Sequence, residues 1–174
     1  MSDTVITIIS IFVVAVLMLV YPLLAVSERN EDVTQLAVQT IVSEFVDTAA
    51  TAGKIRESDY DGFVQKLAAT GNTYDIVVEI QHLDENPGKK AATTSPDMLG
   101  ENVRYSTFGS AIFASDSYKN GGYPLKKGDI IIVNVKNNNT TIAQLLRKFF
   151  YSVTGQGTYQ VGASASSMVV NNGR

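Results

Sequence analysis

The 174-residue chain has no cysteine, no tryptophan and a single histidine, His82. Without cysteine it can form no disulfide, no thiolate metal site and no cysteine nucleophile. A zinc site also needs three or four His, Cys or carboxylate ligands, and no second histidine is present. His82 ends a strand-like run beside Asp84 and Glu85, so we interpret it as a structural surface histidine. We therefore expect no metal, no cofactor and no catalytic residue, and a protein that is not an enzyme.

Motifs for other kinds of chemistry are absent as well. No Gly-x-Ser-x-Gly elbow occurs, and the lysine-rich stretches GKK at 88–90 and KKGD at 126–129 lack the spacing of a phosphate-binding loop. The acids of DENPGKK, residues 84–90, lack the regular alternation of a calcium loop. The formal net charge is −3, with both signs interspersed, and no basic stripe could follow a phosphate backbone. We therefore expect no nucleic-acid partner.

A long apolar run near the N-terminus is the strongest positive signal. Residues 5–26 carry no charge, and about 20 apolar residues in a helix cross a bilayer core of about 30 Å. The run could be a removable signal peptide, a membrane anchor or the packing helix of a filament. The sequence AVS at 25–27 suits a signal-peptide cleavage site. The first three residues, MSD, have no basic residue, however, and the run is too long, so we predict a transmembrane segment over 1–27.

The apolar segment is followed, without a linker, by an amphipathic stretch at 28–53. Its apolar residues recur at steps of three and four, which predicts that one long helix continues to about Ala52 and ends at Gly53. Proline inside this helix predicts a kink near residues 18–22. The predicted membrane or assembly face comprises Val5, Ile9, Phe12, Val16, Leu19 and Pro22. The residues predicted to pack the helix on a sheet are Val33, Leu36, Ile41 and Phe45.

Residues 54–174 read as one extracytoplasmic α+β domain. A helix is expected over 57–71, with Ser58 as N-cap and Gly71 after its end, and another over 138–152. Strands are expected over 73–83, 129–137 and 157–170, an exposed loop over 84–102, and either a short helix or a strand within 104–118. Helices set apart from a small antiparallel sheet define the α+β class, with the amphipathic half of the long helix covering one sheet face.

Three stretches carry a resemblance to a known family. IFVVAVLMLVYPLLAV, with its proline, looks like the N-terminal helix of a type IV pilin or pseudopilin. VDTAATAGKIRESDYDGFVQKLAATGNTYDIVVEIQHLD is similar to small membrane-anchored proteins of Gram-positive bacteria that accompany tight-adherence (Tad, Flp-type) pili or conjugation-like secretion components. YPLKKGDIIIVNVKN resembles the middle strand of these proteins. The resemblance implies a single-pass cell-membrane protein, or a cell-surface filament, whose partners are copies of itself or other pilin-like subunits.

Two departures from the pilin pattern leave the role open. Pilins have a basic leader that ends in glycine, which is absent here, and a glutamate near the start of the mature helix. At that place this chain has the apolar Val5 and Ile6, and Asp3 is the only acid nearby. The departures favour a minor or accessory subunit over a major pilin. The alternative is a bitopic membrane protein whose extracytoplasmic domain binds or scaffolds a partner and never polymerises.

Overall fold

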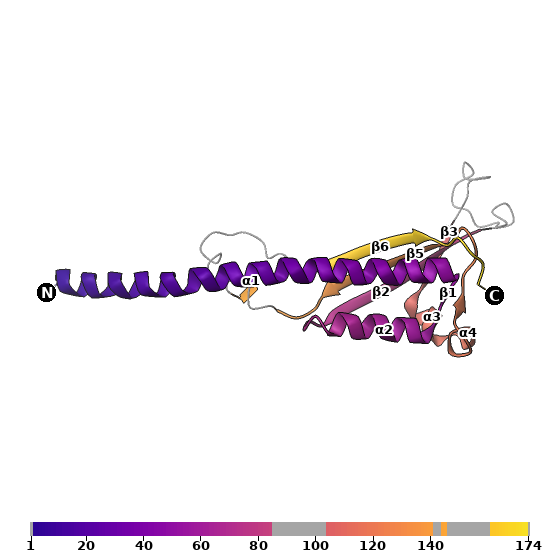
Figure 1. Cartoon of the computed structure of the whole chain (residues 1–174), viewed down its shortest axis with the longest axis horizontal. Helices are drawn as coiled ribbons and strands as arrows, with labels where there is room; N and C mark the ends of the chain where they lie inside the picture. The colour runs from indigo at the N-terminus through magenta and orange to yellow at the C-terminus, as the bar shows by residue number, and fades with distance from the viewer. Residues whose placement is uncertain (1, 85–103, 141–143, 146–160, 174) are drawn as a thin grey trace, which may run out of the picture. The chain divides into compact units, whose positions relative to one another are not determined.

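The computed structural model describes residues 2–84, 104–140, 144–145 and 161–173 (Figure 1). The chain groups into two compact units, one of residues 1–36 and 139–161 and the other of residues 37–138 and 162–174. The predicted division at residues 27 and 53 stays a prediction. The predicted loop at 84–102, apart from Asp84, and most of the predicted helix at 138–152 lie outside the described residues.

One helix, α1, runs from Ser2 to Ala52 and includes Pro22. It ends where the sequence predicts, because Gly53 follows it with a φ of 67°, a left-handed conformation that glycine adopts without strain. The long N-terminal helix is thereby confirmed, and the kink at Pro22 stays a prediction. The first half of α1 belongs to the first unit and residues 37–52 belong to the second.

The second unit is built on a four-stranded antiparallel sheet with the order β3-β2-β5-β6. The two central strands are β2 (Tyr74–Leu83) and β5 (Ile130–Asn137), which pair from Tyr74 opposite Asn137 to Gln81 opposite Ile130. The edge strands are β3 (Arg104–Phe108) and β6 (Gly162–Met168). Both central strands and the α+β class are confirmed.

The helix segment 37–52 lies along one face of this sheet (Figure 1). Its buried side chains lie mostly at steps of three and four: Val38, Val42, Phe45, Val46, Ala49 and Ala50. The buried residues of the central strands alternate, as in Val78 and Ile80 of β2. Each large apolar side chain buried in this layer contributes about 1.5–3 kcal/mol. The amphipathic half of α1 therefore covers the sheet, as predicted.

Small elements close the second unit. Helix α2 spans Glu57–Ala68, the short helices α3 and α4 span Gly109–Ala114 and Asp116–Lys119, and β1 (Lys54–Ile55) pairs with β4 (Tyr123–Pro124). Two sequence expectations change. The N-cap of α2 is Arg56, one residue after β1, so Ser58 lies within the first turn. The ambiguous segment 104–118 contains both a strand and short helices.

An aromatic cluster joins α1, α2 and the short helices. The rings of Phe45 and Phe63 stack with centroids 4.5 Å apart, Tyr60 lies 4.4 Å from Phe113, and Phe113 lies 5.2 Å from Tyr118. Tyr118 is buried, and this burial raises the pKa of its phenol to about 12, with further contributions from the carboxylates of Asp61 and Glu57 and from Tyr60. The cluster therefore holds a phenol that resists ionisation.

This phenol makes stability at high pH depend on Tyr118. In the unfolded chain a tyrosine ionises at about pH 10, whereas the folded state keeps its proton up to about pH 12, so unfolding releases a proton between these values. Stability should therefore fall as the pH rises through this window. We expect Tyr118→Phe to show a weaker fall, measured as the urea midpoint at a series of alkaline pH values. Tyr105→Phe, at an exposed tyrosine, is the control, and an equal slope for both variants would contradict the assignment.

Candidate functional site: an exposed apolar helix and a buried His–Asp pair

The apolar half of α1 exposes its side chains on every side. Each residue from Asp3 to Leu19 is exposed, and the part of the chain that the structure describes contains one helix long and apolar enough to cross a membrane, by length and composition. The exposed fractions of the predicted assembly face range from 41% at Val16 to 68% at Phe12, and Pro22 is also exposed. Apolar surface on this scale is unusual for a water-facing helix and is typical of a surface covered by lipid or protein.

The four residues predicted to pack α1 on the sheet differ in how far their side chains are buried. Phe45 is buried and Ile41 is half-buried, whereas Val33 and Leu36 are 59% and 69% exposed. The buried face begins at Val38, so the covered stripe is rotated relative to the predicted one. Val33 and Leu36 belong to the first unit, whereas the buried small residues Ala49 and Ala50 belong to the second.

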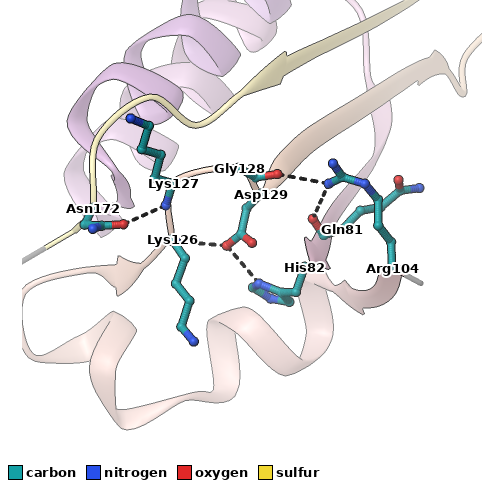
Figure 2. Close-up of polar contacts among 8 residues, drawn as sticks. All are labelled: Gln81, His82, Arg104, Lys126, Lys127, Gly128, Asp129 and Asn172. Carbon is teal, nitrogen blue, oxygen red and sulfur yellow. Dashed lines mark hydrogen bonds and ion pairs between the residues drawn. The ribbon is translucent and has the colours of Figure 1, made fainter. Parts of the chain in front are cut away.

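A polar cluster lies in the second unit at the ends of β2 and β5 (Figure 2). The Nδ1 atom of His82 lies 2.9 Å from Oδ2 of Asp129, and the two side chains are only 11% and 2% exposed. The same Asp129 oxygen accepts a 2.9 Å hydrogen bond from the backbone N–H of Lys126. The ring of His82 also contacts Tyr105, with centroids 5.0 Å apart. Burial of both partners in a hydrogen-bonded pair is the arrangement that offsets their desolvation.

Asp129 closes a tight turn that starts at Lys126. The backbone N–H of Asp129 donates to the carbonyl of Lys126 over 3.0 Å, and Gly128 in the third position has a φ of 95°, which a side chain would strain. The turn is held from both sides: Arg104 donates to the carbonyl of Gly128 over 3.0 Å, and the side-chain oxygen of Asn172 accepts a 2.7 Å hydrogen bond from the backbone N–H of Lys127 (Figure 2). The pair therefore fixes a loop between two sheet elements.

The structure corrects the interpretation of His82 as a surface residue. In β2 the even-numbered residues from Tyr74 to Ile80 face the core, and His82 continues the same alternation. This periodicity was visible in the sequence and would have placed the histidine inside. Its partner Asp129 and the contributions of Arg104 and Asn172 come from distant segments, and nothing local in the sequence indicated them.

The chemistry available to this cluster is limited. A His–Asp pair orients an imidazole in many catalytic sites. Here the pair contacts aromatic rings and the backbone of the turn. Among the residues that the structure describes, no group of three or more His, Asp or Glu side chains could hold a metal ion. The geometry thus suits a structural pair that stabilises the sheet end.

The architecture, a long apolar N-terminal helix packed by its second half on an antiparallel sheet, is pilin-like. Comparisons of the chain with protein-family models, with curated proteins and with solved structures found no match. The class of the fold is therefore defined by its elements alone.

Proposed function

We propose that this protein is a structural or accessory subunit of a pilus-like or secretion apparatus, anchored in the cell membrane through α1 and acting by helix packing. The observation that carries the proposal is the difference in exposure between the two halves of α1. Its first half exposes apolar side chains all round, and its second half buries one face in the domain. The resemblance of the sequence to tight-adherence pilin-like proteins supports the same role.

The apolar surface on the first half of α1 is unfavourable in water, so another apolar surface must shield it. Leaving large aliphatic and aromatic side chains in water costs about 25 cal/mol for each Å² of apolar surface, so lipid or other apolar helices must surround residues 3–26. Lipid suits the stored subunit, because a helix satisfies all its own backbone hydrogen bonds in the bilayer. Helices of neighbouring subunits suit the assembled state. Residues 54–174 then lie outside the membrane, and no step of the role requires catalysis.

Cysteine cross-linking in cells tests the proposal, because the natural chain has no cysteine to interfere. We expect single variants Val13→Cys and Leu17→Cys, on the exposed apolar half of α1, to form disulfide-linked dimers with high yield when oxidised. Ser58→Cys, exposed on α2 of the folded domain, is the control and should link weakly. Purified filaments or secretion complexes should contain the chain, and its deletion should impair their assembly.

A second candidate is a bitopic membrane protein whose domain acts as a monomeric scaffold. The buried, hydrogen-bonded His82–Asp129 pair and the covered sheet face give the domain its own core. A domain with its own core suits a monomeric scaffold. This candidate predicts a monomer in detergent and no cross-linking at Val13. Weak linking at both helix positions, together with normal assembly after deletion, would overturn the subunit proposal in favour of the scaffold.

A further inference from the structure

Two asparagines of this chain are followed directly by glycine: Asn120 precedes Gly121, and Asn172 precedes Gly173. An Asn–Gly step is able to modify itself, because the backbone nitrogen of the glycine can attack the side-chain carbon of the asparagine. Glycine favours this attack, since it has no Cβ to hinder the approach and its backbone rotates easily. The two steps share the same motif, so the fold decides whether they differ in reactivity.

The first step is unrestrained at both reacting groups. Asn120 follows α4, it and Gly121 are exposed, and a Cβ built on Gly121 would meet nothing within 4 Å. Among the residues that the structure describes, no hydrogen bond holds the side-chain amide of Asn120 or the N–H of Gly121. Both residues line an open hollow of about 540 Å³, which leaves room for water and for rotation of the amide. The reacting atoms can therefore approach each other without losing a hydrogen bond of their own.

The second step is held at both reacting groups. The side-chain oxygen of Asn172 accepts a 2.7 Å hydrogen bond from the backbone N–H of Lys127 (Figure 2). The N–H of Gly173 donates to the carbonyl of Leu125 over 2.9 Å. Gly173 also lies so close to the carbonyl of Gly53 that an added Cβ would clash with it. Attack would turn the Gly173 nitrogen away from Leu125, so the fold keeps the reacting atoms out of the geometry that the reaction needs.

We propose that Asn120 is a site of spontaneous deamidation in the folded protein and that Asn172 is protected. The Gly121 nitrogen bonds to Cγ of Asn120, the bond between Cγ and Nδ2 breaks, and Nδ2 leaves as ammonia with the proton that the Gly121 nitrogen gives up. Water then opens the cyclic imide at either carbonyl, which gives aspartate or isoaspartate. Water is the only co-reactant. The inference does not depend on the proposed role as an assembling subunit.

The product changes the segment between α4 and β4. Aspartate at position 120 adds a negative charge to the hollow that Asp116 also lines. Isoaspartate lengthens the main chain by a methylene shortly before Gly122, which lies against β1: a Cβ on Gly122 would be 3.0 Å from the carbonyl oxygen of Ile55. The N–H of Gly122 also donates to the carbonyl of Ser117 over 3.0 Å. A longer main chain displaces Gly122 from these contacts and loosens the pairing of β1 with β4.

Peptide mapping of the full chain in detergent compares the two sites within one molecule. The folded chain is incubated at mildly alkaline pH and digested, and mass spectrometry quantifies the asparagine, aspartate and isoaspartate forms of each peptide. We expect Asn120 to react more than about 10-fold faster than Asn172, because breaking the two hydrogen bonds at Asn172 and Gly173 adds to the barrier there. Equal rates in the folded chain, or a faster reaction at Asn172, would overturn the proposal.

Unfolding in urea is the control for local sequence. Both steps lose their tertiary contacts there, so Asn172 should accelerate until it reacts at a rate similar to that of Asn120. If Asn172 stays slow in urea, its neighbours in the sequence set the rate, and protection by the bonds to Lys127 and Leu125 is wrong.

Matched variants assign the product to one residue. Asn120→Gln should abolish the isoaspartate that accumulates in the folded chain, because the longer side chain has to close a larger ring. Asn172→Gln should leave this isoaspartate unchanged. The opposite pattern would overturn the site. Amide hydrogen exchange measures the consequence: exchange at Ile55 and Tyr123, which pair in β1 and β4, should be faster in chains that contain isoaspartate. Unchanged exchange would overturn the effect on this strand pair.

Discussion

Gly53→Ala should destabilise the second unit by more than about 3 kcal/mol. Gly53 has a φ of 67°, and an added Cβ would meet the carbonyl oxygen of Asn171 and lie 2.7 Å from the nitrogen of Gly173. These atoms belong to backbone, so they cannot rotate away as the end of a long side chain could. The carbonyl of Gly53 also accepts a 2.8 Å hydrogen bond from Leu125, and the backbone N–H of Gly173 donates to the Leu125 carbonyl over 2.9 Å. The substitution therefore disturbs three segments at one point.

Gly71→Ala is the matched control for this result. Gly71 has a φ of 80°, but a Cβ built on it meets nothing within 4 Å, so its replacement should cost only the left-handed penalty of about 1–2 kcal/mol. Thermal unfolding of the full chain in detergent measures both variants. A chain that ends after Val169 lacks residues 171–173, which lie against Gly53. In that chain, Gly53→Ala should lower the free energy of unfolding no more than Gly71→Ala does. A large difference that persists in the shortened chain would show that the C-terminal segment is not the obstacle.

The comparison of these two glycines shows what the sequence could predict. A glycine after an amphipathic run is a local signal, and the end of α1 was predicted correctly at Gly53. The requirement for close approach was not visible, because it depends on residues 171–173, more than a hundred positions away. Local signals thus identified the element boundary and missed the packing that makes the position intolerant of a side chain.

The spacing of apolar residues predicted where helices and strands lie more reliably than it predicted which face of the helix is buried. The alternation in 73–83 predicted the strand that is β2, and steps of three and four predicted the continuation of α1. The predicted packing stripe included Val33 and Leu36, which are exposed, since apolar residues on two neighbouring helix faces fit the same spacing. Which face is covered depends on where the sheet lies. The segment 104–118 was ambiguous because it contains two element types in 15 residues.

Asp129→Ala should be the second strongly destabilising change, with a loss on the order of 3 kcal/mol. Its side chain is 2% exposed, and Oδ2 is the acceptor for the Lys126 N–H and the partner of His82 at 2.9 Å. Alanine leaves a largely buried imidazole and the part-buried backbone N–H of Lys126 without this acceptor. Urea unfolding of the full chain in detergent measures the loss. Asp129→Asn keeps an oxygen acceptor and should lose less.

Glu79→Ala supplies the contrast, because Glu79 also sits on β2 and also accepts hydrogen bonds. Ser106 donates to its carboxylate over 2.6 Å and Gln81 over 3.2 Å, and these bonds hold the pKa of Glu79 below its usual range. These bonds are solvent-accessible, so water replaces them and the loss should stay under about 1 kcal/mol.

A double-mutant cycle then isolates the buried pair. His82→Leu should cost less in the Asp129→Ala background than in the natural chain, because the imidazole has already lost its acceptor there. We expect a coupling energy of about 1–3 kcal/mol. Additive losses would mean that His82 and Asp129 stabilise the sheet end independently, through packing and through the turn. Coupled losses that leave cross-linking at Val13→Cys unchanged would show that the pair maintains the domain, while the exposed half of α1 makes the assembly.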